Sequence, residues 1–255
     1  MTPLSLAVIT HDSEKTLPAV LESVRGLVNE IVLVDDHSTD GTVGIAEAHR
    51  SRVFTRKLES CAAQKQYALD QSRNEWVLLL DSDESCSEEL KAEIAKTAAG
   101  SGGFSAYRVP RRNFYFGRWL AHGGKYPDYQ VRLFRRSSVR YSDHFSHEKV
   151  IVDGRLGTLK GWINHQAYPD LETWWLKLKR TAEFDALEWA RKGVRPTGAN
   201  FVRLCLLRPA WRFCSKYILK RGFLDGVPGL LAALHDVMTQ VLTYHLLSGC
   251  NPASQ

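Results

Sequence analysis

Short apolar runs alternate with segments of helical periodicity over the first hundred residues of the chain. The runs have the length and aliphatic content of buried strands, and they cover residues 4–10, 30–35, 52–54 and 76–80. The segments between them predict helices, at residues 14–25, 40–49, 60–72 and 87–98. Alternation of this kind predicts an α/β domain whose parallel sheet is covered by helices on both faces.

Acidic residues lie where two of these strands end. Asp35 and Asp36 end or follow the second strand, and Asp81 and Asp83 follow the fourth. Ligands of parallel α/β sheets bind beyond the carboxyl ends of the strands. The two acidic segments therefore mark the edge of the sheet where we expect a binding site.

The pattern changes after the glycine-rich residues 100–103. Residues 104–116, 129–134 and 149–152 are rich in β-branched and aromatic side chains, and they predict antiparallel strands added to the sheet. From Leu171 onward the periodicity is helical, and further helices are expected at 200–221 and 227–247. We therefore expect an α/β domain over residues 1–168 and a mainly helical C-terminal region over residues 169–255.

The composition is typical of a folded protein with a large hydrophobic core and reduced cysteines. Hydrophobic residues make up 44% of the 255, enough for a large core, and the net charge of +6 allows nucleic acid, anionic lipid or phosphorylated substrates as partners. Five cysteines without a C-x-x-C pair indicate reduced thiols rather than a disulfide framework or a zinc site. No spanning helix is expected, since polar residues interrupt the most apolar late stretch, 227–247. No signal peptide is expected either, since no basic residue precedes the first apolar run and charged residues follow it at once.

The segment Asp81-Ser82-Asp83 carries the most specific chemistry. Two carboxylates one residue apart, directly after a buried strand, suit a hard divalent cation such as Mg²⁺, which also takes phosphate oxygens of a substrate. The alternative is a solvated acidic loop before a helix that Ser87 caps. At the other strand end, Asp35 and Asp36 can accept hydrogen bonds from a nucleobase or a ribose, or can form a turn before a helix capped by Asp40.

In this order and separation, the two segments resemble family 2 glycosyltransferases of the GT-A fold. Residues 30–42 resemble the nucleoside-binding segment of that family, residues 64–69 its basic helix start, and residues 78–84 its metal segment. The resemblance implies that the backbone of Thr10, with Asp36 and Lys65, holds the base of a UDP-sugar. It also implies that Asp81 approaches the ribose and the metal, and that Asp83 ligates Mg²⁺ or Mn²⁺.

Later motifs resemble the lipopolysaccharide-core β-glucosyltransferase subgroup. They are residues 126–136, His147-Glu148 and Asn164-His165. The subgroup inverts the anomeric centre, which requires a general base, for which Glu148 is the first candidate and Asp128 the second. Glu148 could instead be a strand-edge partner of Arg132 or Lys149. Arg132 could bind a diphosphate through two hydrogen bonds. His165 could be a core or turn residue, and the alternative is that it binds a ligand.

Basic residues gather near the C-terminus, where no Asp or Glu occurs between Glu188 and Asp225. Arg208, Arg212, Lys216 and Lys220 recur every four residues of the predicted helix 200–221, which favours one basic face. A basic face beside an apolar one suits an anionic membrane surface, and the alternative is a solvated basic face over a packed core helix.

The resemblance implies an inverting enzyme that transfers a sugar, with glucose the first candidate, from a UDP-sugar to a lipopolysaccharide-core or related cell-envelope glycan. A cytoplasmic enzyme peripheral to the inner membrane is expected. The enzyme alternative is transfer to a polyprenyl phosphate or another polysaccharide. The non-enzyme alternative is a basic nucleic-acid- or membrane-binding protein. We expect no nucleic-acid partner, because the acidic strand ends would repel phosphates.

Overall fold

The computed structural model describes residues 2–100, 102–142 and 149–247, and these form two compact units. The first unit is α/β and contains the described residues within 1–112 and 128–166. The second is mainly helical and contains residues 113–127 with the described residues after 166. The insertion 113–127 thus belongs with the C-terminal helices, although it lies between two strands of the α/β unit in sequence.

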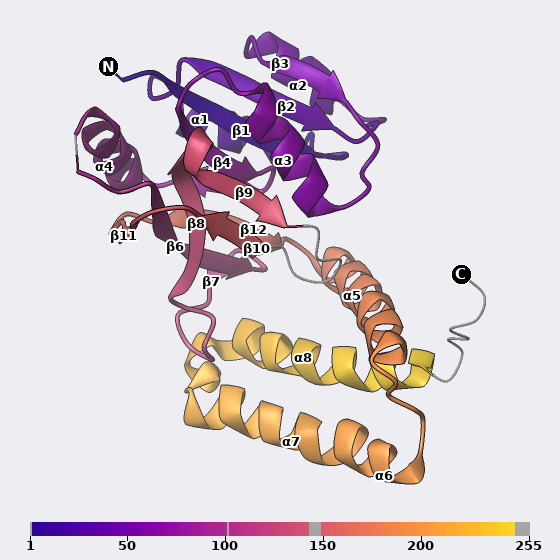
Figure 1. Ribbon diagram of the computed structural model, residues 1–255. Coiled ribbons are helices and arrows are strands. Elements are labelled where there is room, and N and C mark those ends of the chain that lie inside the picture. The colour runs from indigo at the N-terminus through magenta and orange to yellow at the C-terminus, as the bar shows by residue number, and fades with distance from the viewer. Residues whose placement is uncertain (1, 101, 143–148, 248–255) are drawn as a thin grey trace. The chain divides into compact units, whose positions relative to one another are not determined.

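A mixed sheet forms the centre of the α/β unit (Figure 1). Its strand order is β3-β2-β1-β4-β8-β6-β12-β5, in which the first four strands are parallel and β8 is antiparallel to β4. The strands are β1 (Leu4–Thr10), β2 (Glu30–Asp35), β3 (Arg52–Thr55), β4 (Trp76–Asp81), β5 (Glu84–Cys86), β6 (Ala106–Tyr115), β8 (Asp128–Arg135) and β12 (Ile163–Tyr168), and the short β11 (Leu156–Thr158) pairs with β6.

Four helices connect the parallel strands or follow them. They are α1 (Leu17–Ser23), α2 (Thr42–Ala48), α3 (Cys61–Gln71) and α4 (Glu88–Ala99). The side chains of Ser60 and Ser87 cap α3 and α4 by accepting hydrogen bonds from the first turn of each helix. Alternate residues of β1 pack on opposite faces of the sheet: Leu6 lies in a cluster with α1 and α4, and Ala7 in one with α3. The predicted coverage of both faces is confirmed.

One predicted strand takes a different partner. Residues 149–152 do form a strand, β10 (Lys149–Val152), but it pairs with β9 (Val139–Ser142) in a separate two-stranded sheet. The prediction that it extends the main sheet is therefore wrong. The strands β5, β9, β11 and β12 were not predicted, because they are short or carry polar residues and lack a clear alternation.

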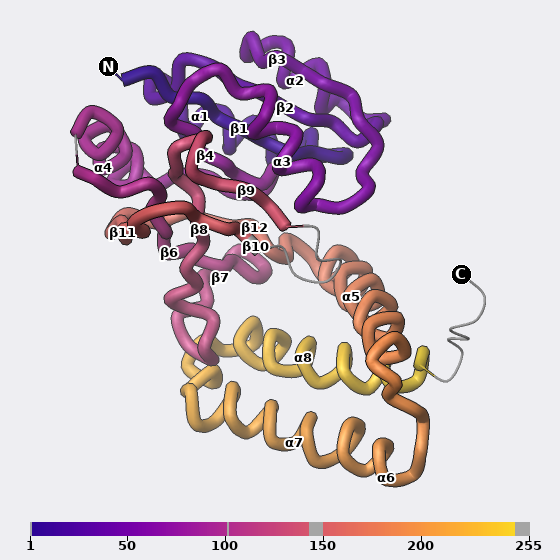
Figure 2. Tube along the Cα trace, viewed as in Figure 1, coloured from indigo at the N-terminus to yellow at the C-terminus, as the bar shows by residue number. Residues whose placement is uncertain are grey.

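The helical unit is built from α5 (Leu171–Arg191), a long helical segment over residues 198–219, and α8 (Gly226–Leu247). Figure 2 follows the long segment as one continuous coil. It consists of α6 (Gly198–Phe201), α7 (Arg208–Phe213) and two stretches of wider π-type turns, Val202–Leu207 and Cys214–Leu219. The helix α8 packs against both α5 and α7. Among the residues described, no helix combines the length and apolarity needed to cross a bilayer.

The predicted basic face of the long helical segment is only partly formed. Lys216 pairs with Asp236 of α8, and the side chain of Lys125 lies within 3.8 Å of the same carboxylate. Arg212 is half-buried, whereas Arg208 and Lys220 are exposed. Of the four residues predicted to share this face, Lys216 is therefore paired within the helical unit, whereas Arg208 and Lys220 are left exposed.

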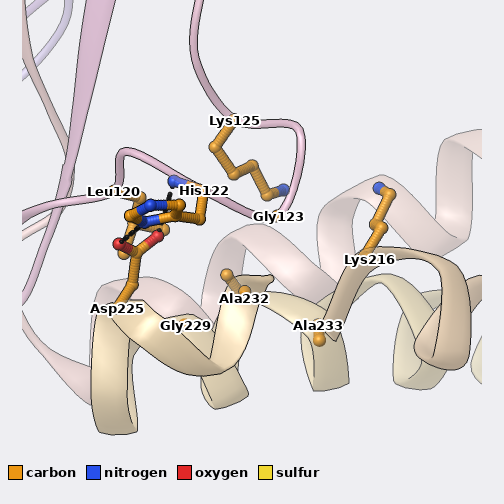
Figure 3. Close-up of a pocket in the computed structure, with 10 residues that line it drawn as sticks. Leu120, His122, Gly123, Lys125, Lys216, Asp225, Gly229, Ala232 and Ala233 are labelled. Atoms are coloured by element: carbon orange, nitrogen blue, oxygen red, sulfur yellow. Dashed lines mark hydrogen bonds and ion pairs between the residues drawn. The ribbon is translucent and has the colours of Figure 1, made fainter. Parts of the chain in front are cut away.

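The loop that contains Leu120, His122 and Lys125 lies against the start of α8 (Figure 3). Asp225 accepts hydrogen bonds from the backbone N–H and the ring of His122, at 2.9 and 2.8 Å. A methyl group added at Gly229 would lie 2.1 Å from the carbonyl oxygen of Gly222, so only glycine allows this approach. The neighbouring cavity of about 10 Å³ has room for one water molecule and is too small for a substrate.

His235 of α8 makes the stability of the helical unit depend on pH. Burial, with the charges of Lys125 and Lys216 in addition, lowers the pKa of His235 to about 4, although Asp236 opposes the shift. The unfolded chain therefore binds a proton that the folded unit excludes as the pH falls from 6.5 towards 4. We expect this residue to reduce the free energy of unfolding by about 2 kcal/mol between pH 7.5 and pH 5.0.

Urea unfolding of the wild type and of His235→Gln at both pH values measures this contribution. The loss on acidification should be smaller by that amount in the variant. Equal losses in the two proteins would show that His235 does not couple folding to protonation.

Candidate active site

The register of the parallel strands brings the predicted donor-binding residues to one edge of the sheet. Thr10 at the end of β1 pairs with Asp35 of β2, and Ile9 pairs with Asp81 of β4. Thr10 is buried, and within the described part of the chain its hydroxyl has no hydrogen-bond partner. The predicted convergence of Thr10, Asp35 and Asp81 is therefore found at the carboxyl ends of adjacent strands.

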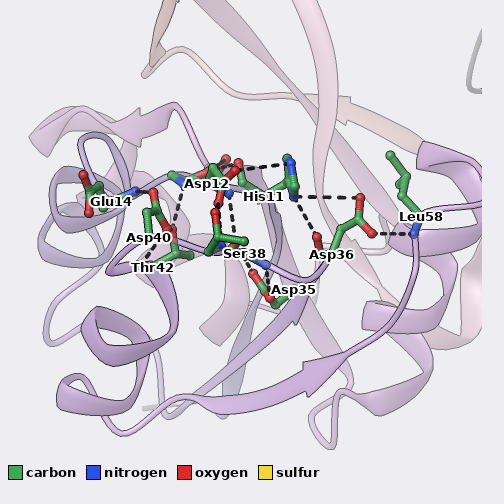
Figure 4. Close-up of polar contacts among 12 residues, drawn as sticks. His11, Asp12, Glu14, Asp35, Asp36, Ser38, Asp40, Thr42 and Leu58 are labelled. Atoms are coloured by element: carbon green, nitrogen blue, oxygen red, sulfur yellow. Dashed lines mark hydrogen bonds and ion pairs between the residues drawn. The ribbon is translucent and has the colours of Figure 1, made fainter.

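Two loops at this edge are held together by carboxylates that accept backbone hydrogen bonds (Figure 4). Asp12 accepts from the N–H of Thr39 at 2.7 Å, and Glu14 accepts from the N–H of Gly41 at 2.9 Å. Asp40 accepts from the N–H of Thr42, the first residue of α2. The loop after β1 and the loop after β2 thus form one rigid rim.

The neighbouring residues Asp35 and Asp36 have different surroundings. The carboxylate of Asp35 is 2% exposed and accepts hydrogen bonds from the N–H and the hydroxyl of Ser38. Asp36 is partly exposed, accepts from the N–H of Leu58 and lies 4.0 Å from His11. We therefore assign Asp35 to the turn and retain Asp36 as the candidate for donor contact.

Lys65, Asp81 and Arg132 form a chain of charges beside this rim. Lys65 Nζ lies 2.9 Å from one carboxylate oxygen of Asp81, and Arg132 donates to the other at 2.5 Å. Burial raises the pKa of Asp81, but the charges of Arg132 and Lys65 outweigh this and hold that pKa well below its usual range. Asp81 is therefore ionised at neutral pH, and two cations are fixed beside it.

The row of charges continues through Glu84 and Arg111, for which the sequence predicted no role, to Asp128. Glu84 is fully buried and accepts hydrogen bonds from Arg132 at 2.7 Å and from Arg111 at 2.8 Å. Arg111 also donates to Asp128 at 2.8 and 2.9 Å. Glu84 directly follows the Asp81-Ser82-Asp83 segment, but its partners come from β6 and β8, far away in the sequence.

Replacing Glu84 by Gln should strongly destabilise the α/β unit. The change keeps the shape of the side chain but leaves two buried guanidinium groups without their shared negative charge. Removal of one partner from a buried ion pair costs about 3–5 kcal/mol. Urea unfolding measures the loss, and Glu22→Gln, which affects only an exposed pair with Arg25, should cost less than about 1 kcal/mol. Equally small losses would contradict a central role for Glu84.

A polar cavity of about 250 Å³ opens onto this charge chain. Its lining includes Lys65, Asp81, Arg111, Gln130 and Arg132. Three of these side chains are cationic and one, Asp81, is anionic, so the lining has a net positive charge that suits an anionic group. Three predicted donor-binding residues, Lys65, Asp81 and Arg132, therefore line one cavity.

Asp83 is not part of the row of paired charges and lies next to His165. The Nε2 atom of His165 is 3.4 Å from a carboxylate oxygen of Asp83, because β12 runs antiparallel to β5 with His165 opposite Glu84. A carboxylate and an imidazole fit a divalent cation that draws its other ligands from a substrate and water. Within the described ranges, no cluster of three or more His, Cys, Asp or Glu side chains could hold a metal alone.

Of the two candidates for the general base, the structure describes only Asp128. Asp128 is partly exposed, and its carboxylate also accepts a hydrogen bond from Gln130 at 2.7 Å in addition to those from Arg111. Glu148, like the neighbouring His147, lies outside the described residues.

Comparison with known proteins identifies the family. The model of glycosyl transferase family 2 matches residues 5–148, more than half of the chain. The lipopolysaccharide core biosynthesis glycosyltransferase LpsC of Rhizobium meliloti is 27% identical over 248 residues, covering 94% of this chain and 90% of LpsC. An uncharacterised glycosyltransferase of Rickettsia typhi is 25% identical over 246 residues, covering 92% and 82%.

Among solved structures, TarS of Staphylococcus aureus superposes with a TM-score of 0.47 at 16% identity, covering 100% of this chain and 92% of that one. The family match and the mixed sheet followed by helices confirm the predicted GT-A-like α/β fold. The chain belongs to glycosyl transferase family 2.

Proposed function

We propose that this enzyme transfers a sugar, with glucose the first candidate, from a UDP-sugar to a lipopolysaccharide-core or related cell-envelope glycan, with inversion at the anomeric carbon. The observation that carries the proposal is the cavity in which Lys65, Arg132 and Asp81 meet beside the strand ends. The cations of the cavity suit a diphosphate. Thr10 and Asp36, at the neighbouring ends of β1 and β2, are placed to bind a nucleoside.

Each residue of this edge has a distinct role in the proposal. The backbone of Thr10 and the carboxylate of Asp36 bind the base and the ribose. Lys65, which the resemblance assigns to the base, lines the cavity with Arg132, and we propose that both bind the diphosphate. Asp81 holds both cations in place before the donor enters. Because the cations are buried and already oriented, they stabilise the charge that develops on the departing diphosphate without reorganising.

Asp83 and His165 are the residues that would hold Mg²⁺ or Mn²⁺. Asp81 is a second candidate, although both of its oxygens are paired with cations. When bound, the ion would supply Lewis-acid stabilisation of the leaving diphosphate. The mixed oxygen and nitrogen ligands suit Mn²⁺ at least as well as Mg²⁺.

Inversion by single displacement requires a base that takes the proton of the acceptor hydroxyl. We propose Glu148 for this role and keep Asp128 as the second candidate. The hydrogen bonds from Arg111 and Gln130 occupy both oxygens of Asp128 and stabilise its charged form. This occupancy favours Glu148.

The similarity to LpsC over most of both chains supports the acceptor class. A polyprenyl phosphate remains the alternative acceptor. Transfer of radiolabelled glucose from UDP-glucose to purified lipopolysaccharide with a truncated core tests the proposal, with polyprenyl phosphate in a parallel reaction. Label in the lipopolysaccharide, dependent on Mn²⁺ or Mg²⁺ and β-linked by NMR, is the expected result. Label in the polyprenyl phosphate alone would establish the alternative, and an α-linked product would refute inversion.

A further inference from the structure

The helical unit presents large apolar side chains to its surroundings. Sixteen of the nineteen exposed large hydrophobic residues in the described part of the chain belong to it. On the helical segment 198–219, five are more than half exposed, and we call them the apolar face: Leu206, Leu207, Trp211, Ile218 and Leu219. Leu207 and Trp211 lie four residues apart at the start and within α7, which places these two on one side of the helix.

The helix α8, which packs against α7, buries mostly small and polar residues. Buried positions of α8 include Gly229, Ala232, Ala233, Thr239 and Thr243. Soluble helical proteins bury their largest apolar side chains between helices and expose polar ones. The helical unit does bury Leu178, Leu204 and Leu247, but it also exposes many large apolar side chains. Small buried residues together with exposed large apolar ones are typical of helices in contact with lipid.

Positive charge is concentrated in the part of the sequence that contains the apolar face. Residues 189–224 contain nine Lys and Arg and no Asp or Glu, whereas the whole chain has a net charge of only +6. Arg203, Arg208, Lys220 and Arg221 are exposed. Burial, and then repulsion by Arg212 and Arg203, lower the pKa of Arg208, although Asp185 opposes the shift. Clustered cations beside apolar side chains suit an anionic lipid surface.

We propose that the apolar face and these cations dock the helical unit on an anionic bilayer, with the helical segment 198–219 lying in the plane of the headgroups. The cations recur along the segment, which fits a helix at the interface rather than one that spans the membrane. A second copy of the chain fits the same face poorly, because a two-fold contact would bring two sets of cations together. Membrane binding by this unit does not depend on which sugar the α/β unit transfers.

Co-sedimentation with sucrose-loaded vesicles tests the docking surface. The full-length protein should bind vesicles of phosphatidylethanolamine and phosphatidylglycerol, bind phosphatidylcholine vesicles far more weakly, and lose affinity as NaCl rises. Leu207→Glu/Trp211→Glu should lower the partition coefficient at least about tenfold, a change of 1.4 kcal/mol. Arg203→Gln/Arg208→Gln should lower binding to the anionic vesicles by a similar factor without changing the residual binding to neutral ones.

The matched control is Leu176→Glu/Phe184→Glu, which adds the same charge at two side chains of α5 with 53% and 54% exposure. It should stay within about twofold of the wild type, and circular dichroism should show that all variants keep their helices. Two results would overturn the proposal: no binding of the wild type to anionic vesicles, or equal losses in the control and in Leu207→Glu/Trp211→Glu. If light scattering instead shows a dimer that Trp211→Glu dissociates while vesicle binding persists, the face is an interface between two copies.

Discussion

Replacing Asp83 by Ala should lower the rate of sugar transfer by about three orders of magnitude or more, while the protein stays folded. Electrostatic stabilisation of a leaving diphosphate by a metal ion is worth several kcal/mol. Asp83 is partly exposed on the turn between β4 and β5, and it is not a member of the buried charge chain. Its loss should therefore remove metal-dependent turnover without the stability loss expected for Glu84.

Initial rates of UDP release at saturating donor, measured over a range of Mn²⁺ concentrations, check this prediction. His165→Ala should shift the metal dependence in the same direction, because its ring faces Asp83. Asp153→Ala is the matched control, since it removes an exposed carboxylate of the same unit. Wild-type turnover by Asp83→Ala at limiting Mn²⁺ would remove Asp83 from the metal site.

Glu148→Gln should leave donor binding intact and lower transfer by about two to four orders of magnitude, the usual contribution of a general base. Glutamine keeps the size of the side chain and its hydrogen bonding but cannot take the proton of the acceptor hydroxyl. Calorimetric titration with UDP measures donor binding, and single-turnover transfer measures the chemical step.

The competing candidate is tested in the same way. Asp128→Asn weakens the pair with Arg111, so a modest loss of stability is expected, together with a loss of transfer well below that of Glu148→Gln. If Asp128→Asn shows the large loss of transfer with normal donor binding and Glu148→Gln does not, Asp128 is the base and our assignment is wrong.

The parallel half of the fold could be predicted from the sequence because its information is local. Strands β1 and β2 have the predicted bounds, and the acidic residues follow β2 and β4 as expected. The antiparallel half could not be predicted to the same extent. Its strands are short or polar, and their pairing depends on contacts between distant segments, such as β12 with β5 and β10 with β9.

The same distinction applies to the candidate site. Asp36, Lys65, Asp81 and Asp83 belong to short motifs, and the sequence located them. His165 was also named as a possible ligand, but its position beside Asp83, like that of Arg111 beside Glu84, depends on the pairing of distant strands, which no local pattern specifies. Helical periodicity likewise identified separate basic and apolar residues in the segment 198–219, but it could not show that Trp211 points outward and that Lys216 pairs with Asp236.

The most direct test of the proposed donor site is calorimetric titration of the purified protein with UDP and UDP-glucose, with and without Mn²⁺. We predict saturable binding of both ligands, strengthened by Mn²⁺ and lost in Lys65→Met, which removes a cation from the cavity wall. Absence of binding under every condition, with GDP and TDP equally silent, would contradict a nucleotide-sugar site at this edge of the sheet.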